Sequence, residues 1–297
     1  MEILIATLVR GIGIGSTYAL IAVGFVIIYR ATDVVNFAQP TLVILGAYVN
    51  FVFVFNVGVP FPLAVIGSMA TMAVVGALIE RVALRPMVGQ PPFSAAMVTV
   101  GLFFALFVLA NWIFGSAVIT MGDPWGLSRV DFLGVSVGQI DLAKTVISLS
   151  AIGVVGVFLH RSKLGLAMRA TALDQEVSLA QGINVGQIFG VSWAMSGALA
   201  ALAGVMIGTG GGGLVAIDAF VALKALPVLI LGGLDSIKGS VVAGLFIGVA
   251  EALTRAYQPG VDIVGQNFDV VVPYLIMVIA LMVRPYGLYG TREVHRV

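Results

Sequence analysis

Residues 34–79 read VVNFAQPTLVILGAYVNFVFVFNVGVPFPLAVIGSMATMAVVGALI and contain no Asp, Glu, Lys or Arg. Charge-free runs also cover residues 86–122 and 177–217. An apolar helix of about 20 residues crosses the roughly 30 Å hydrocarbon core of a membrane. Each run is therefore long enough for one or two crossings, and the sequence predicts an all-α, polytopic transmembrane helical bundle.

The composition supports a membrane protein that lies in a lipid bilayer. The 297 residues are 60% hydrophobic and 10% charged, with a mean hydropathy of +1.11, whereas soluble domains carry about 25% charged residues. The net charge of +1 suggests no nucleic-acid partner. With no cysteine and two histidines, we expect neither disulfides nor a metal site.

We predict eight or nine spans in one membrane domain that covers residues 1–297. Segment 219–234 is short and contains Lys224 and Pro227, so it is either a full crossing or a broken or re-entrant helix. The predicted spans are 5–28, 40–56, 60–79, 94–114, 144–160, 187–208, 219–234, 239–256 and 270–283.

Basic residues concentrate in alternate loops, which predicts the orientation. Short cytoplasmic loops are rich in Lys and Arg, so we expect the N-terminus outside and the C-terminus in the cytoplasm. The residues on the predicted cytoplasmic side are Arg30, Arg81, Arg85, Arg161, Lys163, Arg169, Lys238, Arg284, Arg292 and Arg296.

Glycine pairs with GxxxG spacing predict close helix packing, because small residues let helix backbones approach each other. The pairs are Gly11 with Gly15, Gly182 with Gly186, Gly204 with Gly208, and Gly244 with Gly248.

The predicted cytoplasmic loop at residues 161–185 reads RSKLGLAMRATALDQEVSLAQGINV. Residues 173–181 favour a short helix, with Asp174 and Glu176 near its start, where the helix dipole favours acids. Gly182 suits a left-handed cap at its end. This helix either docks onto a cytoplasmic partner or is a solvated connector.

Polar residues within spans are further candidates for function. Pro40 disfavours helix at Gln39, so Asn36 and Gln39 either line a solute pathway or belong to an ordinary turn. Glu251 and Arg255 are four residues apart on a predicted helix and are expected to pair. Lys224 is expected to extend its ammonium group toward the membrane surface.

Four segments resemble, in order, the LivH-like permeases of branched-chain amino acid type ABC importers. They are GIGIGSTYALIAVGFVIIYRATDVVNFAQPTLVILGAYV at residues 11–49, GLAMRATALDQEVSLAQGINVGQI at 165–188, LPVLILGGLDSIKGSVVAGLFIGVAEAL at 226–253 and VRPYGLYG at 283–290. Gly165, Arg169 and Gly182–Asn184 fit the family's coupling segment. Gln39 and Pro40 replace its His-Gly, and Asp235 replaces a glycine, which leaves the substrate open.

The resemblance implies a permease of the bacterial inner membrane for branched-chain amino acids or related small amides or acids, with no enzymatic activity and no cofactor. It implies assembly with a second homologous permease, two cytoplasmic ATP-binding subunits and an extracytoplasmic substrate-binding protein. The residues expected to couple the permease to the ATPase are Arg169, Asp174, Glu176, Gly182, Ile183 and Asn184.

Nucleotide chemistry is not expected in this chain. GGLDSIKGS at residues 232–240 resembles a phosphate loop, but a P-loop needs a lysine directly after glycine. ATP would therefore be hydrolysed by a separate subunit. The alternatives are a self-sufficient ion-coupled secondary transporter or channel, which would need carboxylates at the membrane centre, and a structural subunit without a solute pathway.

Overall fold

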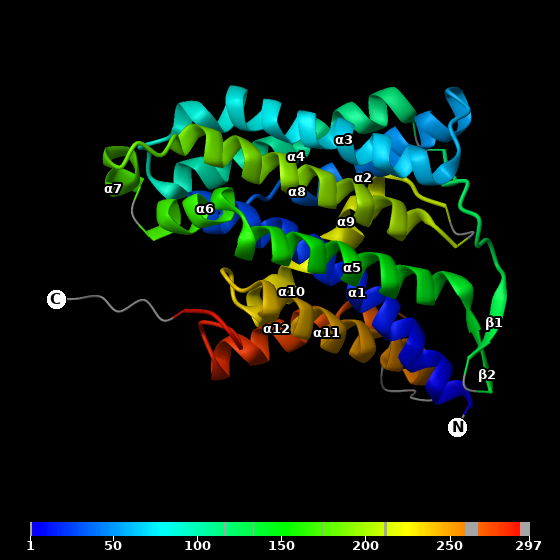
Figure 1. The fold of residues 1–297 in the computed structure, drawn as a ribbon. Coiled ribbons are helices and arrows are strands. Elements are labelled where there is room, and N and C mark those ends of the chain that lie inside the picture. Colours follow the sequence, from blue (N-terminus) through cyan, green and yellow to red (C-terminus); the bar gives the residue numbers. More distant parts are fainter. Residues whose placement is uncertain are drawn as a thin grey trace.

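A computed structural model of the chain is a bundle of helices with one short β-hairpin (Figure 1). It describes residues 2–115, 117–132, 134–173, 175–210, 213–258 and 267–291. Seven helices in these ranges are long and apolar enough to cross a membrane, which confirms the predicted bundle. They are α1 (Glu2–Thr32), α2 (Gln39–Phe51, continued by a π-helical turn to Asn56), α3 (Phe61–Ile79), α4 (Pro92–Phe114), α5 (Gln139–Arg161), α8 (Val185–Gly208) and α11 (Ile237–Tyr257).

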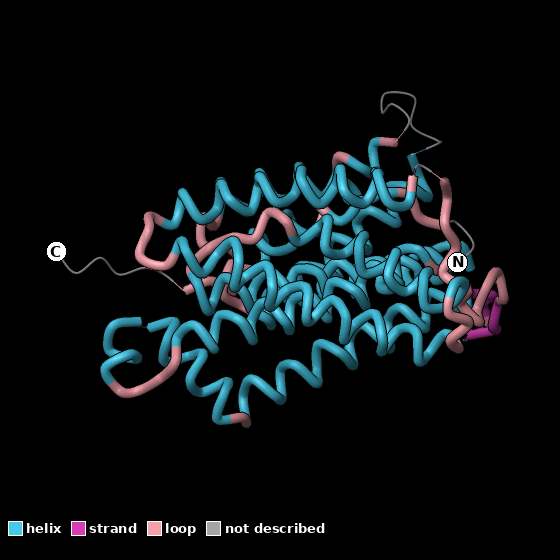
Figure 2. The backbone as a smooth tube through the Cα atoms, turned by 90° about the horizontal axis from the view of Figure 1, so that it is seen from above, coloured by secondary structure: helices cyan, strands magenta, loops and turns pink. Residues whose placement is uncertain are grey.

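Shorter elements join the long helices. The β-hairpin and the start of α1 lie at one end of the bundle, and α6 and α7 lie at the other (Figures 1 and 2). We call these the hairpin end and the α7 end. The shorter elements are β1 (Arg129–Phe132), β2 (Val135–Gly138), α6 (Lys163–Leu173), α7 (Gln175–Ala180), α9 (Ala219–Ala222), α10 (Ala225–Gly232) and α12 (Val272–Val283).

Proline and glycine set several helix boundaries. Pro40, Pro62 and Pro92 lie in the first turns of α2, α3 and α4, where the missing N–H has no helical partner in any case. Gly115 and Gly233 follow α4 and α10 with φ of 71° and 106°, a conformation that glycine adopts without strain.

Segment 219–234 runs between the two ends of the bundle as a broken helix. α8 ends at the hairpin end, since Gly210 lies against Ile140 at the start of α5. α11 begins at the α7 end, because Asp235, just before it, lines the same cavity as Arg169 of α6. The intervening chain contains α9 and α10, interrupted at Leu223–Lys224. Of the predicted alternatives for segment 219–234, the structure therefore shows the broken helix.

The centre of the bundle is α1, against which α5, α8, α10 and α11 pack. A Cβ on Gly15 would lie 2.5 Å from the Gly244 carbonyl oxygen, and a Cβ on Gly248 would overlap the Gly15 backbone. Gly11 likewise faces Gly248 and Val249. Two of the predicted GxxxG pairs therefore face each other across α1 and α11, which run antiparallel.

Replacing Gly248 with leucine should separate α1 from α11. Overpacking of this kind costs about 1–3 kcal/mol or more, so the melting temperature of the purified protein in detergent should fall. The matched control is Gly153→Leu, because a Cβ on Gly153 of α5 would have no neighbour within 4 Å. Equal melting temperatures for the two variants would contradict the packing described.

Candidate functional site

The elbow between α5 and α6 is built by two residues of the predicted coupling segment. A Cβ on Gly165 would overlap the backbone of Leu159. The Arg169 guanidinium donates a hydrogen bond to the Leu159 carbonyl oxygen, one of the carbonyls left without a partner at the end of α5. Gly165 and Arg169 thus fix the angle at which α6 leaves α5.

The connection from α7 to α8 is fixed by three successive residues, Gly182, Ile183 and Asn184. Gly182 has φ of +82°, and the N–H groups of Gly182 and Ile183 donate to the carbonyls of Leu179 and Ser178 at 3.0 Å. This is a Schellman cap, so the predicted cap at Gly182 is present. Ile183 packs against the main hydrophobic core. The Asn184 side chain accepts from the Gln187 N–H at 3.0 Å and caps α8.

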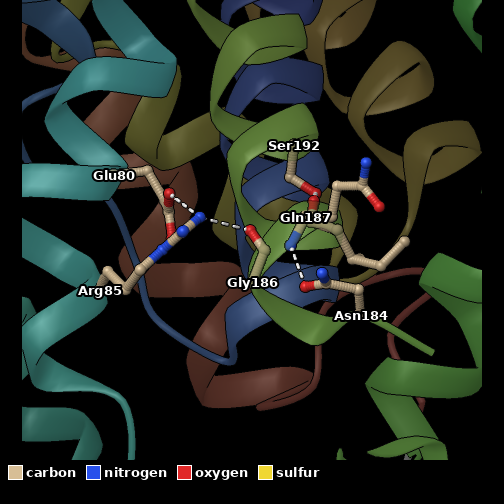
Figure 3. A network of polar contacts seen from close by, with 7 residues as sticks. Glu80, Arg85, Asn184, Gly186, Gln187 and Ser192 are labelled. Carbon is tan, nitrogen blue, oxygen red and sulfur yellow. Dashed lines mark hydrogen bonds and ion pairs between the residues drawn. The ribbon is translucent and has the colours of Figure 1, made fainter. Parts of the chain in front are cut away.

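An ion pair ties the end of α3 to this junction (Figure 3). Arg85 donates two hydrogen bonds to the Glu80 carboxylate, at 3.1 and 2.8 Å, and a third to the Gly186 carbonyl oxygen at 2.7 Å. The Glu80 side chain is 1% exposed. The first turn of α8 is therefore held by caps along its own chain and by Arg85 from the side.

The two acidic residues predicted for coupling cannot be placed with the others. Asp174 lies outside the described residues, as does the side chain of Glu176, whose backbone belongs to α7. The other four predicted coupling residues all lie at the α7 end: Arg169 at the elbow, Gly182 and Ile183 at the cap, and Asn184 at the start of α8. Their role in coupling stays a prediction.

The predicted pathway residues belong to a buried polar cluster. Asn36 and Gln39 are both 0% exposed, and the Asn36 amide donates to Gln39 Oε1 at 3.1 Å. The Ser196 hydroxyl lies 2.9 Å from both Gln39 Oε1 and the Gly24 carbonyl oxygen. The cluster joins α1, α2 and α8, and neither predicted residue lines the cavities described below.

A second ion pair lies inside the bundle and differs from the expected pairing. Lys224 Nζ lies 2.6 Å from Glu251 Oε1, while Arg255 pairs with Asp269 at 2.9 Å. The expected Glu251–Arg255 pair was therefore wrong. Lys224 was wrongly expected to reach the membrane surface, since its side chain is only 7% exposed.

Two cavities lie at opposite ends of α1. The hairpin-end cavity has a volume of about 1000 Å³ and is lined by α1 residues between Ile3 and Tyr18. The α7-end cavity has about 970 Å³ and begins at Tyr29 of α1. Residues 19–28 of α1 are buried between them. A packed core therefore separates the cavities in this arrangement.

The broken segment contributes to the same two cavities. Phe220, Val221 and Lys224 line the hairpin-end cavity. Ile230 and Leu234 line the α7-end cavity, together with Asp235, which directly follows the segment. Arg169 of the elbow also lines the α7-end cavity, so the predicted coupling segment reaches the interior of the bundle.

A family model described as the permease component of branched-chain amino acid transport systems matches residues 7–281. The chain belongs to this family. This permease is thus a multi-pass protein of the inner membrane, and its family consists of transport permeases rather than enzymes.

Curated relatives match the permease over nearly its whole length. It is 28% identical to the high-affinity branched-chain amino acid transport system permease protein LivH of Escherichia coli K12, with 97% of this chain and 96% of the relative covered. It is 30% identical to the corresponding protein BraD of Pseudomonas aeruginosa, with 98% and 97% covered. A probable LivH from Methanocaldococcus jannaschii is 28% identical, with 91% and 88% covered.

Sequence reasoning did not assign Glu80 and Arg85 to the junction. The sequence did contain a signal for this pair. Glu80 directly follows the longest charge-free run, residues 34–79, and Arg85 comes five positions later. In an α-helix, side chains that pair are three or four residues apart. Glu80 and Arg85 are five apart, and a π-helical turn at Glu80–Leu84 brings them together.

The left-handed backbone at Gly182 gives a test of the coupling junction. Gly182→Val should strain the cap, because β-branched residues are disfavoured at positive φ, and should reduce both transport and substrate-stimulated ATP hydrolysis in the assembled complex. Gly182→Asn should retain most activity, since asparagine tolerates this conformation. Membrane insertion should be normal for both. Full transport by the valine variant would exclude a role for the cap.

Proposed function

We propose that this chain is the permease subunit of an ABC importer for branched-chain amino acids or related small amides or acids. The main support is the α6–α7 segment, which joins two membrane-length helices and is fixed by the elbow and by the caps. The names of the relatives supply the substrate class.

The proposed orientation has the α7 end in the cytoplasm and the hairpin end outside. Arg81, Arg161 and Arg284 lie at the ends of α3, α5 and α12, and these helices end at the α7 end. This agrees with the excess of basic residues in cytoplasmic loops. Two ATP-binding subunits would bind at this end. A second homologous permease would lie alongside, and a substrate-binding protein would deliver the solute to the hairpin end.

Coupling would be mechanical. Closure of the ATP-binding subunits would shift α7, with Asp174 and Glu176 as predicted docking residues, and the cap at Gly182–Asn184 would transmit the shift to α8. Because α8 packs against α1, α2 and α3, its displacement would disturb the packed core between the cavities. Asn36 and Gln39 remain candidate pathway residues that would meet the solute when α2 and α8 separate.

The rival function is a self-sufficient ion-coupled transporter or channel. It would need a carboxylate free to exchange an ion with the solute pathway. Glu251, a buried acidic residue that lines the hairpin-end cavity, is instead engaged by Lys224 and Tyr18. This pairing favours the ATP-driven alternative.

Reconstitution separates the two functions. The purified chain alone in proteoliposomes should neither hydrolyse ATP nor accumulate leucine under a proton or sodium gradient, because its sequence lacks a P-loop. The complex with its partner subunits should take up leucine only with ATP and the binding protein. Gradient-driven uptake by this chain alone would contradict the proposal.

A further inference from the structure

The hairpin-end cavity reaches deep into the bundle. The α1 residues that line it extend from Ile3 to Tyr18, about 22 Å along the axis at 1.5 Å per residue. At Tyr18, the last lining residue of α1, the cavity meets the Lys224–Glu251 pair, next to the break between α9 and α10. A solute that enters from the hairpin end therefore reaches this pair about halfway along α1.

The ion pair is buried, but the hydrogen-bond donors of its lysine are not all used. The side chains of Lys224 and Glu251 are 7% and 5% exposed, and the Tyr18 hydroxyl donates to Glu251 Oε2 at 3.0 Å. An ammonium group has three N–H donors, and among the described residues Lys224 Nζ has Glu251 as its one hydrogen-bond partner. The pair thus keeps unused donors on a group that lines a cavity.

Stability alone does not explain such a pair. Replacing a buried ion pair with apolar residues of similar size is often neutral or stabilising, and charges within membrane spans are costly and commonly functional. The cavity as a whole favours a ligand carboxylate, since its lining holds five basic and two acidic side chains. These are Arg10, Arg129, Lys144, Lys224 and Arg255, with Asp141 and Glu251.

We propose that the hairpin-end cavity binds an α-amino acid as its zwitterion at the Lys224–Glu251 pair. The ligand carboxylate accepts from Lys224, and the ligand ammonium donates to Glu251. This inference rests on the proposed function and adds a solute site within the chain itself. Apolar lining residues surround a branched side chain: Ile14, Ile140, Met206, Ile207, Phe220 and Val221.

Charge balance makes the site selective. The bound ligand comes between Lys224 and Glu251 and separates them. A zwitterion carries one charge of each sign, so each of the two side chains gains a ligand group as its new partner. A simple carboxylate leaves Glu251 without its cation, and a simple amine leaves Lys224 without its anion. Unpaired buried charges are strongly unfavourable, so leucine should bind while 4-methylpentanoate and leucinamide should not.

The first test uses the wild-type complex of permease and ATP-binding subunits, prepared without the substrate-binding protein. Leucine should raise its melting temperature, whereas 4-methylpentanoate and leucinamide should leave it unchanged. A complex that transports leucine once the binding protein is added, but shows no leucine-dependent shift without it, would overturn the site and leave the proposed function intact. A complete complex that transports no amino acid would overturn the proposed function itself.

The second test changes the pair. The double variant Lys224→Met with Glu251→Gln keeps side-chain size and removes both charges, and its leucine uptake should fall about tenfold or more, since two charge-assisted hydrogen bonds are lost. Lys238→Met, at an exposed lysine of the α7 end, is the matched control and should transport normally.

The reversed pair Lys224→Glu with Glu251→Lys separates a structural role from binding. It keeps an ion pair, so the complex should assemble normally, but the ligand charges now meet groups of the wrong sign and uptake should stay low. Wild-type uptake by the neutral or the reversed variant would show that the pair is structural and would overturn the inference.

Discussion

The close approach of α1 to its neighbours at glycine is the constraint on which the rest of the bundle depends. Gly15 and Gly248 meet with no space for a side chain, and Gly204 of α8 likewise lies against the Val43 backbone of α2. In lipid, helices associate through such packing rather than through exclusion of water. The contacts bury α1 from Ser16 to Ile28 and so create the core around which the other helices are arranged.

The same packing explains why the two cavities do not meet. α1 and the broken segment pass from one cavity to the other. Between the cavities α1 is enclosed by α5, α8, α10 and α11, and α10 of the broken segment packs against α1, α11 and α12. The polar cluster of Asn36, Gln39 and Ser196 lies at this level, since Ser196 bonds to Gly24 of α1. In the proposed mechanism, movement of α8, whose first turn is fixed to the α7 segment and to Arg85, would open the core.

The sequence predicted features that depend on local spacing or on whole runs of residues. The apolar runs predicted the helices, and Gly182 was correctly identified as a cap. The GxxxG spacing predicted close helix packing without naming partners; α1 and α11 show it, whereas a Cβ on Gly182 would have no neighbour within 4 Å. Predictions of interactions between residues far apart in the sequence were absent or wrong. Glu251 was assigned to Arg255 at helical spacing, yet it pairs with Lys224, 27 positions earlier, because the break before α10 turns Lys224 inward.

Cysteine labelling along α1 tests directly whether a packed core separates two cavities that open to opposite sides. The chain has no native cysteine, so single variants can be labelled cleanly with a membrane-impermeant thiol reagent. In the resting complex, Thr7→Cys should react only from outside, Arg30→Cys only from the cytoplasmic side, and Ala22→Cys from neither. Labelling of Ala22→Cys at the rate of Thr7→Cys, or reversed sidedness of the other two variants, would contradict the account.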